Sequence, residues 1–153
     1  MPYSVLEQIQ IFHSLPEAQR QALLEAGEVK TFAADAIILN ENDQQHSLYI
    51  VLEGKAEAFL PKTPERFTAV RLSELAPGQC FAEYAFVDQQ PASASIRALT
   101  DVQVFCIDYE TLHALLEANP AVASILYRNL LHILVQRLRK SNAELDLFSL
   151  AFD

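Results

Sequence analysis

The spacing of hydrophobic residues changes twice along this chain, and that change restricts the folds it can adopt. Between residues 4 and 27, apolar side chains such as Val5, Leu6 and Ile9 recur at helical spacing. Between residues 28 and 108 they gather in short runs, and from residue 109 the spacing is helical again. We therefore expect a strand-rich body between two sets of helices.

The expected strands are short and evenly spaced. They cover residues 36–39, 48–52, 56–60, 69–72, 95–98 and 102–107, with turn signals at 40–43, 53–54, 61–64 and 77–78. This pattern is typical of a sandwich, jelly roll or small barrel. We predict one mainly β domain over residues 1–153, with short helices in 1–27, a sandwich, jelly roll or small barrel in 28–108 and helices in 109–153.

Composition and charge limit the possible location and partners of the protein. Apolar residues make up 51% of the chain, which favours a folded core, and the formal charge of −9 opposes binding to nucleic acid. The N-terminus lacks the features of a signal peptide, and no stretch approaches the roughly 20 apolar residues of a membrane span. We expect a cytoplasmic protein, with no membrane contact and with Cys80 and Cys106 as reduced core residues.

Residues 78–98, GQCFAEYAFVDQQPASASIRA, carry the strongest functional signal. They are expected to form a strand end, a tight turn, a short helix and a loop that leads into a new strand. The first backbone N–H groups of a helix point outward without intrahelical partners, so this shape suits a small anion.

This segment resembles the phosphate-binding cassette of cyclic-nucleotide-binding domains. Glu83, Ala85, Pro91, Ser93 and Ala94 fit the family pattern. Further stretches that resemble the family are residues 11–16, 48–54, 72–78 and 119–120. Together they make the chain similar to the sensor domain of catabolite-activator (Crp/Fnr-like) transcription factors over roughly residues 10–145. The resemblance implies a jelly-roll barrel (double-stranded β-helix) in residues 28–108, followed by a long C-terminal dimerisation helix.

The resemblance implies a ligand site in the cassette. Its residues would be Ala82, Glu83, Tyr84, Ala85, Ala92, Ser93 and Ala94. Glu83 would accept a hydrogen bond from a ribose 2′-hydroxyl, and Ser93 would donate one to a phosphate oxygen. From the residues alone, Glu83 is better explained as an acid in the first turn of a helix, and Ser93 as a turn residue that bonds its own backbone.

Two cassette positions differ from the family. Ala82 stands where the family has glycine, so its methyl group either narrows the pocket or requires ordinary helical angles. Ala92 stands where the family has the arginine that grips the phosphate. Losing a bidentate, charge-assisted pair costs roughly 2–5 kcal/mol, or about 30-fold to several thousand-fold in affinity. Lys62, Arg66 or Arg71 could reach in from neighbouring strands as a replacement cation, and the sequence alone does not decide this.

Two functions remain open. In the first, the pocket binds a cyclic nucleotide or another small anionic ligand, with weak or absent binding of cyclic AMP, and the domain reports occupancy through its last helix. In the second, the pocket is vestigial and the domain is a homodimeric interaction module.

The last helix supports the idea of a dimer. Asn119 would cap it and Pro120 would be its first residue. A heptad stripe predicts a helical interface and contains Tyr127, Leu131, Leu134, Leu138, Ser141, Leu145, Phe148 and Phe152. A second stripe, which can cover the barrel, contains Val122, Ile125, Leu126, Leu130 and Ile133. The alternative is that both stripes pack on one domain.

Other functions have less support. Arg128, Arg137, Arg139 and Lys140 cluster near His132 on the last helix, which indicates a solvated helix face more simply than a DNA footprint. The sequence ends before any helix-turn-helix, so we expect no direct DNA binding. The four histidines are far apart and no nucleophile elbow or metal-ligand motif is present, so we expect no enzyme and no metal site.

Overall fold

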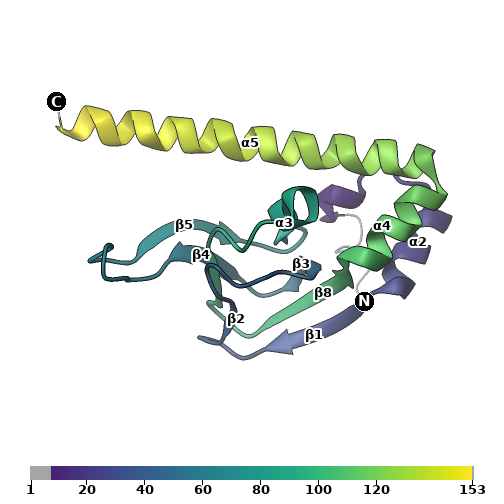
Figure 1. The fold of residues 1–153 in the computed structure, drawn as a ribbon, viewed down its shortest axis with the longest axis horizontal. Helices are drawn as coiled ribbons and strands as arrows, with labels where there is room; N and C mark the ends of the chain where they lie inside the picture. The colour runs from purple at the N-terminus through teal and green to yellow at the C-terminus, as the bar shows by residue number, and fades with distance from the viewer. Residues whose placement is uncertain (1–7, 153) are drawn as a thin grey trace.

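Two four-stranded antiparallel sheets form the body of the protein (Figure 1). The structure, a computed structural model, describes residues 8–152. The first sheet has the order β1 (Glu28–Phe32), β8 (Val102–Asp108), β3 (Ser47–Glu53), β6 (Cys80–Phe81). The second has the order β2 (Ile37–Leu39), β7 (Ser95–Ala98), β4 (Ala56–Leu60), β5 (Val70–Leu75). The predicted class, a mainly β jelly-roll body with flanking helices, is confirmed.

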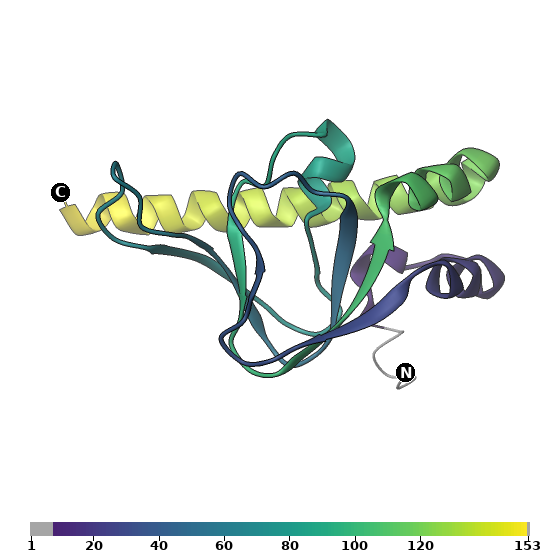
Figure 2. The same cartoon turned by 60° about the horizontal axis from the view of Figure 1, so that its bottom comes forward.

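Helices lie at one end of the sheets and along one side of them (Figures 1 and 2). Their bounds are η1 (Gln10–Phe12), α2 (Glu17–Ala26), α3 (Glu83–Asp88), α4 (Tyr109–Ala118) and α5 (Pro120–Phe152). The start of α5 follows the prediction, because the Asn119 side chain accepts a hydrogen bond from the backbone N–H of Val122 at 3.3 Å. The short helix α3, inside the cassette, lies between the sheets and α5.

The core has two parts. The larger cluster joins the first sheet to the helices and includes Phe12, Leu48, Phe105 and Leu112. Four residues of the second predicted stripe, Val122, Leu126, Leu130 and Ile133, are buried in this cluster, and Ile125 packs against it. The smaller cluster lies between the two sheets. Burying each large apolar side chain contributes about 1.5–3 kcal/mol, so these contacts fix the first half of α5 on the body.

Tight turns position the two ends of the cassette. Gly78 has a φ of 91°, and a Cβ at this position would overlap the carbonyl oxygen of Gln8. Only glycine fits such a site without strain. Asn42 has a φ of 72°, in the left-handed region that asparagine tolerates. Its N–H donates to the Ala92 carbonyl at 2.8 Å, which joins this turn to the end of the cassette.

Candidate functional site

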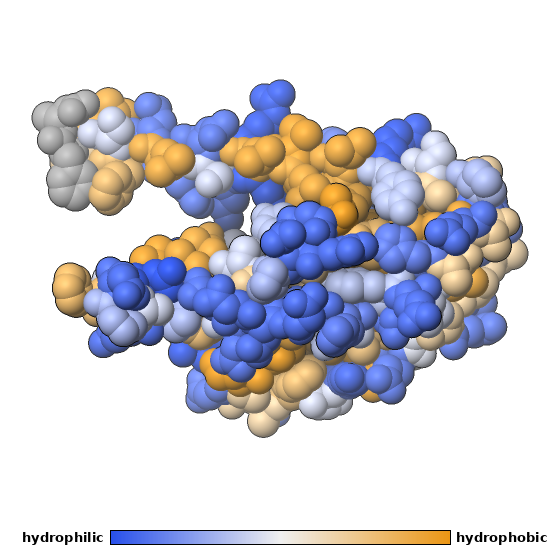
Figure 3. Space-filling view, viewed as in Figure 1, coloured by the Kyte–Doolittle hydropathy of each residue, from blue (hydrophilic) through white to orange (hydrophobic). Residues whose placement is uncertain are grey.

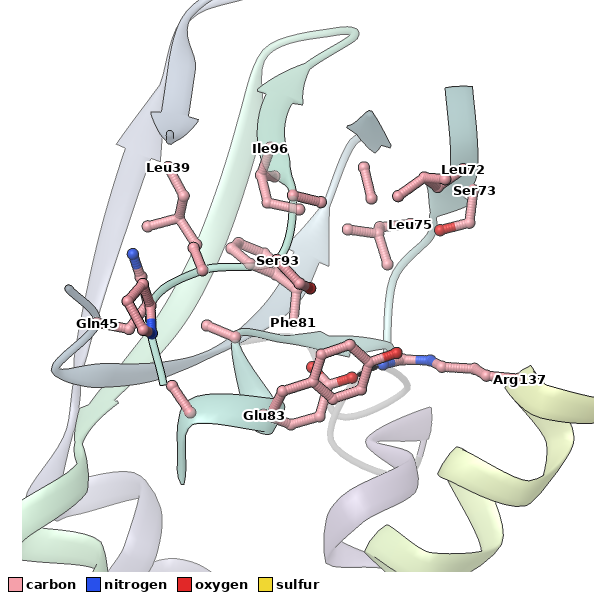
Figure 4. A pocket seen from close by; sticks show the side chains of 17 residues that line it. Leu39, Gln45, Leu72, Ser73, Leu75, Phe81, Glu83, Ser93, Ile96 and Arg137 are labelled. Atoms are coloured by element: carbon pink, nitrogen blue, oxygen red, sulfur yellow. Dashed lines mark ion pairs between the residues drawn. The ribbon is translucent and has the colours of Figure 1, made fainter. Parts of the chain in front are cut away.

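A cavity of about 150 Å³ lies between the second sheet, the cassette and α5 (Figure 4). Hydrophobic side chains from the sheets, among them Leu39, Leu75 and Ile96, form one side of it. The cavity is also lined by all seven cassette residues that the family resemblance pointed to, namely Ala82, Glu83, Tyr84, Ala85, Ala92, Ser93 and Ala94. Their role in binding a ligand stays a prediction.

Ala82 adopts a backbone conformation that alanine seldom takes. It has a φ of 64° and a ψ of 22°, in the left-handed region, so the second of the two alternatives, ordinary helical angles, is wrong. This conformation costs a residue with a Cβ roughly 1–2 kcal/mol. The Tyr109 hydroxyl donates a hydrogen bond to the Ala82 carbonyl. Because burial raises the pKa of Tyr109, this hydroxyl keeps its proton at neutral pH.

Glu83 begins α3 and is only 3% exposed. Its carboxylate forms an ion pair with the guanidinium of Arg137, which extends from α5 (Figure 4). Arg137 Nη2 also donates to the carbonyl oxygen of Cys80 at 2.6 Å. Arg137 was expected on a solvated helix face, and that expectation was wrong. A signal for its position existed, because Arg137 follows Leu130 by seven residues and Ile133 by four, on the buried side of the helix.

The three cations considered as replacements for the missing arginine do not line the cavity, and two of them pair with carboxylates elsewhere. Arg66 pairs with Glu41 at 3.3 Å, and Arg71 pairs with Glu57 at 2.6 Å. Neither of them, nor Lys62, lines the cavity. Among the described residues, the charged side chains that line it are Glu83 and Arg137, one negative and one positive.

The sequence of this domain matches the model of a known protein family. The sequence model of the cyclic nucleotide-binding domain matches residues 29–119, more than half of the chain and including the whole cassette. The chain belongs to the cyclic nucleotide-binding domain family.

Individual members give the same picture. The cyclic AMP receptor protein of Thermus thermophilus is 30% identical over 139 residues, which cover 91% of this chain and 62% of that protein. A cAMP-dependent protein kinase regulatory subunit of Hypocrea atroviridis is 32% identical over 111 residues, 72% of this chain and 22% of that protein. The crystal structure of the Thermus thermophilus catabolite activator protein superposes with a TM-score of 0.76 at 28% identity, covering 92% of this chain and 63% of that one. This chain therefore spans less than two thirds of each of these proteins.

In this cyclic nucleotide-binding domain, aromatic contacts join the cassette to the helices. The ring of Phe86 in α3 stacks on His113 of α4, with 4.3 Å between ring centroids, and lies 6.3 Å from the ring of Tyr127 in α5. Tyr127, predicted in the dimer stripe, thus packs within its own chain and is 39% exposed. A movement of α3 would therefore change its packing against both α4 and α5.

The rest of the predicted dimer stripe divides into two groups. Leu134 is partly buried against the core of its own chain. Leu131, Leu138 and Leu145 are 63–65% exposed, and Ser141 is exposed beside them. Figure 3 shows hydrophobic surface along the middle of α5. The alternative in which both stripes pack on one domain is therefore wrong for these three leucines.

The cysteines and the histidines take no part in the cavity. Cys80 and Cys106 are buried free thiols, as expected. Burial raises the pKa of the Cys80 thiol, against the opposing effect of the Arg137 charge, so this thiol is uncharged at neutral pH. Within residues 8–152, no group of three or more His, Cys, Asp or Glu side chains is arranged to hold a metal ion. No helix in that range is long and apolar enough to cross a bilayer.

Proposed function

We propose that this chain is a regulatory module that binds a small anionic ligand, a cyclic nucleotide or a related compound, in the cavity beside Glu83. The observation that carries this proposal is that all seven predicted cassette residues, Glu83 and Ser93 among them, line one cavity. The names of the relatives support it, since they include a cyclic AMP receptor and a cAMP-dependent kinase regulatory subunit. Occupancy would reach α5 through Phe86 and Arg137, which contact that helix or belong to it.

The affinity for cyclic AMP should be low. Ala92 contributes a methyl group where a guanidinium would form two charge-assisted hydrogen bonds to a phosphate. Its backbone is fixed at the cavity, because its N–H donates to Asp43 at 2.9 Å and its carbonyl accepts from Asn42. A longer side chain at position 92 would therefore extend from a fixed backbone position on the cavity wall.

Calorimetric titration of cyclic AMP into the wild type and Ala92→Arg tests the proposal. We expect weak binding by the wild type and a gain of about 30-fold or more in Ala92→Arg, from the added charge-assisted pair. Gln90→Arg is the matched control, because Gln90 is exposed and does not line the cavity. It should change the affinity by less than about twofold, since exposed charges are screened. A folded Ala92→Arg that gives no heat at millimolar cyclic AMP would contradict the proposal.

A second candidate function is a homodimeric interaction module with a vestigial pocket. The exposed leucines of α5 favour it, because monomers seldom expose a row of large apolar side chains to water. Both candidates are non-catalytic roles. Both also fit a cytoplasmic setting, which two buried unpaired thiols support, and the charge of −9 favours a partner other than DNA.

A further inference from the structure

Gln45 is a buried polar residue of the cavity that lies outside the cassette. It precedes β3, lines the cavity and is only 7% exposed. We propose that the side-chain amide of Gln45 donates a hydrogen bond to the anionic group of the ligand, at the place where residue 92 offers only a methyl group. This inference rests on the proposed function. It assigns a neutral donor to the part of the site where a charged one is missing.

Hydrogen bonds place Gln45 beside Ala92. The carbonyl oxygen of Asp43 accepts one hydrogen bond from Gln45 Nε2 at 3.2 Å and another from the Ala92 N–H at 2.9 Å. Two donors that share one acceptor atom lie next to each other. The chain is also held on the other side of Gln45, because the His46 carbonyl accepts from the Tyr109 N–H at 2.8 Å. The backbone around Gln45 is therefore fixed before a ligand enters.

The Gln45 amide has hydrogen-bonding capacity to spare. An amide side chain has two N–H donors and a carbonyl acceptor. Among residues 8–152, the hydrogen-bond partner of this side chain is the Asp43 carbonyl, which uses one donor. Burying polar groups without partners is unfavourable. A phosphate oxygen that enters the cavity beside Ala92 would accept a hydrogen bond from the second donor.

The charged side chains of the cavity leave this part of the site to neutral groups. Glu83 and Arg137 are the charged side chains among the described lining residues, and they pair with each other. Figure 4 shows Gln45 and Arg137 on opposite sides of the cavity. A ligand hydroxyl on Glu83 would leave the anionic oxygens of the same molecule to the neutral donors of Gln45 and Ser93.

These donors define the group that the ligand carries. A neutral amide stabilises a phosphate less than a guanidinium does, because it brings no positive charge and one N–H in place of two parallel ones. Such a donor suits an anion whose single charge is shared by several oxygen atoms. The phosphodiester of a cyclic nucleotide is a group of this kind, so cyclic AMP is the probe for this contact.

Calorimetric titration of cyclic AMP into the full chain tests the contact. Gln45→Met keeps a side chain of similar length without the amide, and it should weaken binding by about three- to tenfold, the equivalent of one hydrogen bond. Gln45→Glu should bind about tenfold or more weakly than Gln45→Met, because its carboxylate would face the phosphate. An amide that only supports the turn at residues 43–45 predicts equal affinities for the two folded variants.

Gln44 provides the matched control. It precedes Gln45 in the chain, is exposed and does not line the cavity. Gln44→Met and Gln44→Glu make the same two changes one position away, and both should leave the affinity within about twofold of the wild type. Thermal melting shows whether each variant folds, and Gln45→Leu replaces Gln45→Met if that variant does not.

A double variant gives a readout that does not depend on Gln45→Glu. In the Ala92→Arg background, Gln45→Met should change the affinity by less than about twofold, because the new guanidinium then binds the phosphate. A purely structural amide would cost the same factor in both backgrounds, since its effect would not pass through the ligand.

Each outcome decides between this inference and the proposed function. Equal affinities of the wild type and Gln45→Met, equal affinities of folded Gln45→Met and Gln45→Glu, or equal losses in the two backgrounds would overturn the role of Gln45. Binding by Ala92→Arg with none by the wild type would overturn this inference alone, because the neutral amide would then not hold the anion. If neither the wild type nor Ala92→Arg binds cyclic AMP, the proposed function fails with it.

Discussion

Glu57 shows how one buried carboxylate can join three strands. It lies in β4 and is 4% exposed, and it pairs with Arg71 of β5 and with Arg97 of β7. Arg97 also covers the ring of Phe59, at 4.5 Å from the ring centroid. Burial alone would raise the pKa of Glu57, but the hydrogen bonds from Arg97 and Arg71 outweigh it and hold this pKa below its ordinary value of 4.5.

That lowered pKa predicts a pH dependence of folding. Between the folded and the unfolded pKa of Glu57, the unfolded chain binds more protons, so stability rises with pH there. The contribution is complete above about pH 4.5 and is lost as the pH falls through the lower, folded value. Glu57→Gln should lower the free energy of unfolding by about 1–2 kcal/mol at pH 7, an amount reduced by the partial exposure of both arginines.

Urea denaturation at pH 7 and near pH 3.5 checks this effect. The difference in unfolding free energy between the wild type and Glu57→Gln should shrink at the lower pH, because the Glu57 carboxylate of the unfolded chain is then mostly protonated and part of its stabilising effect is lost. Glu53→Gln is the matched control, since Glu53 is exposed at the end of β3. A constant difference at both pH values would contradict the assignment.

At the scale of residues, the sequence identifies local features well and distant partners poorly. The cassette residues and the alanines at 82 and 92 are visible in one short segment. The partner of Glu83 is 54 positions away along the chain, on another element. No local pattern predicts that pair, although the spacing of Arg137 from Leu130 and Ile133 marks the side of α5 on which it lies.

At the scale of elements, α5 has two different parts. Its first half packs on the core through Leu126, Leu130 and Ile133. Residues 141–151 are exposed throughout. A helix with a buried first half and an exposed apolar continuation is suited to a partner helix, and a second copy of the chain is the commonest partner.

Leu138→Asp tests the dimer. We expect the wild type to sediment as a dimer at micromolar concentrations and Leu138→Asp as a monomer, because a charge in a helical seam is strongly disfavoured. The substitution should leave the fold of the chain intact, because Leu138 is 63% exposed. Gln136→Asp adds the same charge at an exposed position on another side of α5 and should leave the assembly unchanged. A monomeric wild type would contradict the dimer proposal.

The elements themselves are largely predictable from this sequence, whereas their pairing is not. The change in hydrophobic period indicates the helices and most of the strands, and Asn119 with Pro120 indicates the start of α5. Strand order depends on contacts between distant segments. Glu28 of β1, for example, pairs with Cys106 of β8. Only the resemblance to a family supplied an architecture for these strands.

At the scale of the whole molecule, the cavity and α5 form one connected unit. Arg137 joins the helix to Glu83, and Phe86 joins the cassette to α4 and α5 through His113 and Tyr127. Tyr109 fixes the strained Ala82 from the start of α4. A ligand in the cavity would touch groups held by each of these contacts, so binding and the position of α5 should depend on each other.

The most direct test is an NMR titration of the ¹⁵N-labelled chain with cyclic AMP, observing the side-chain Nε–Hε signal of Arg137. We predict that this signal shifts together with the backbone amide signals of Glu83, Tyr84 and Ala85, and that all saturate at the same ligand concentration. Cassette signals that shift while the Arg137 signal does not, or shifts confined to another surface, would contradict a ligand site between the cassette and α5.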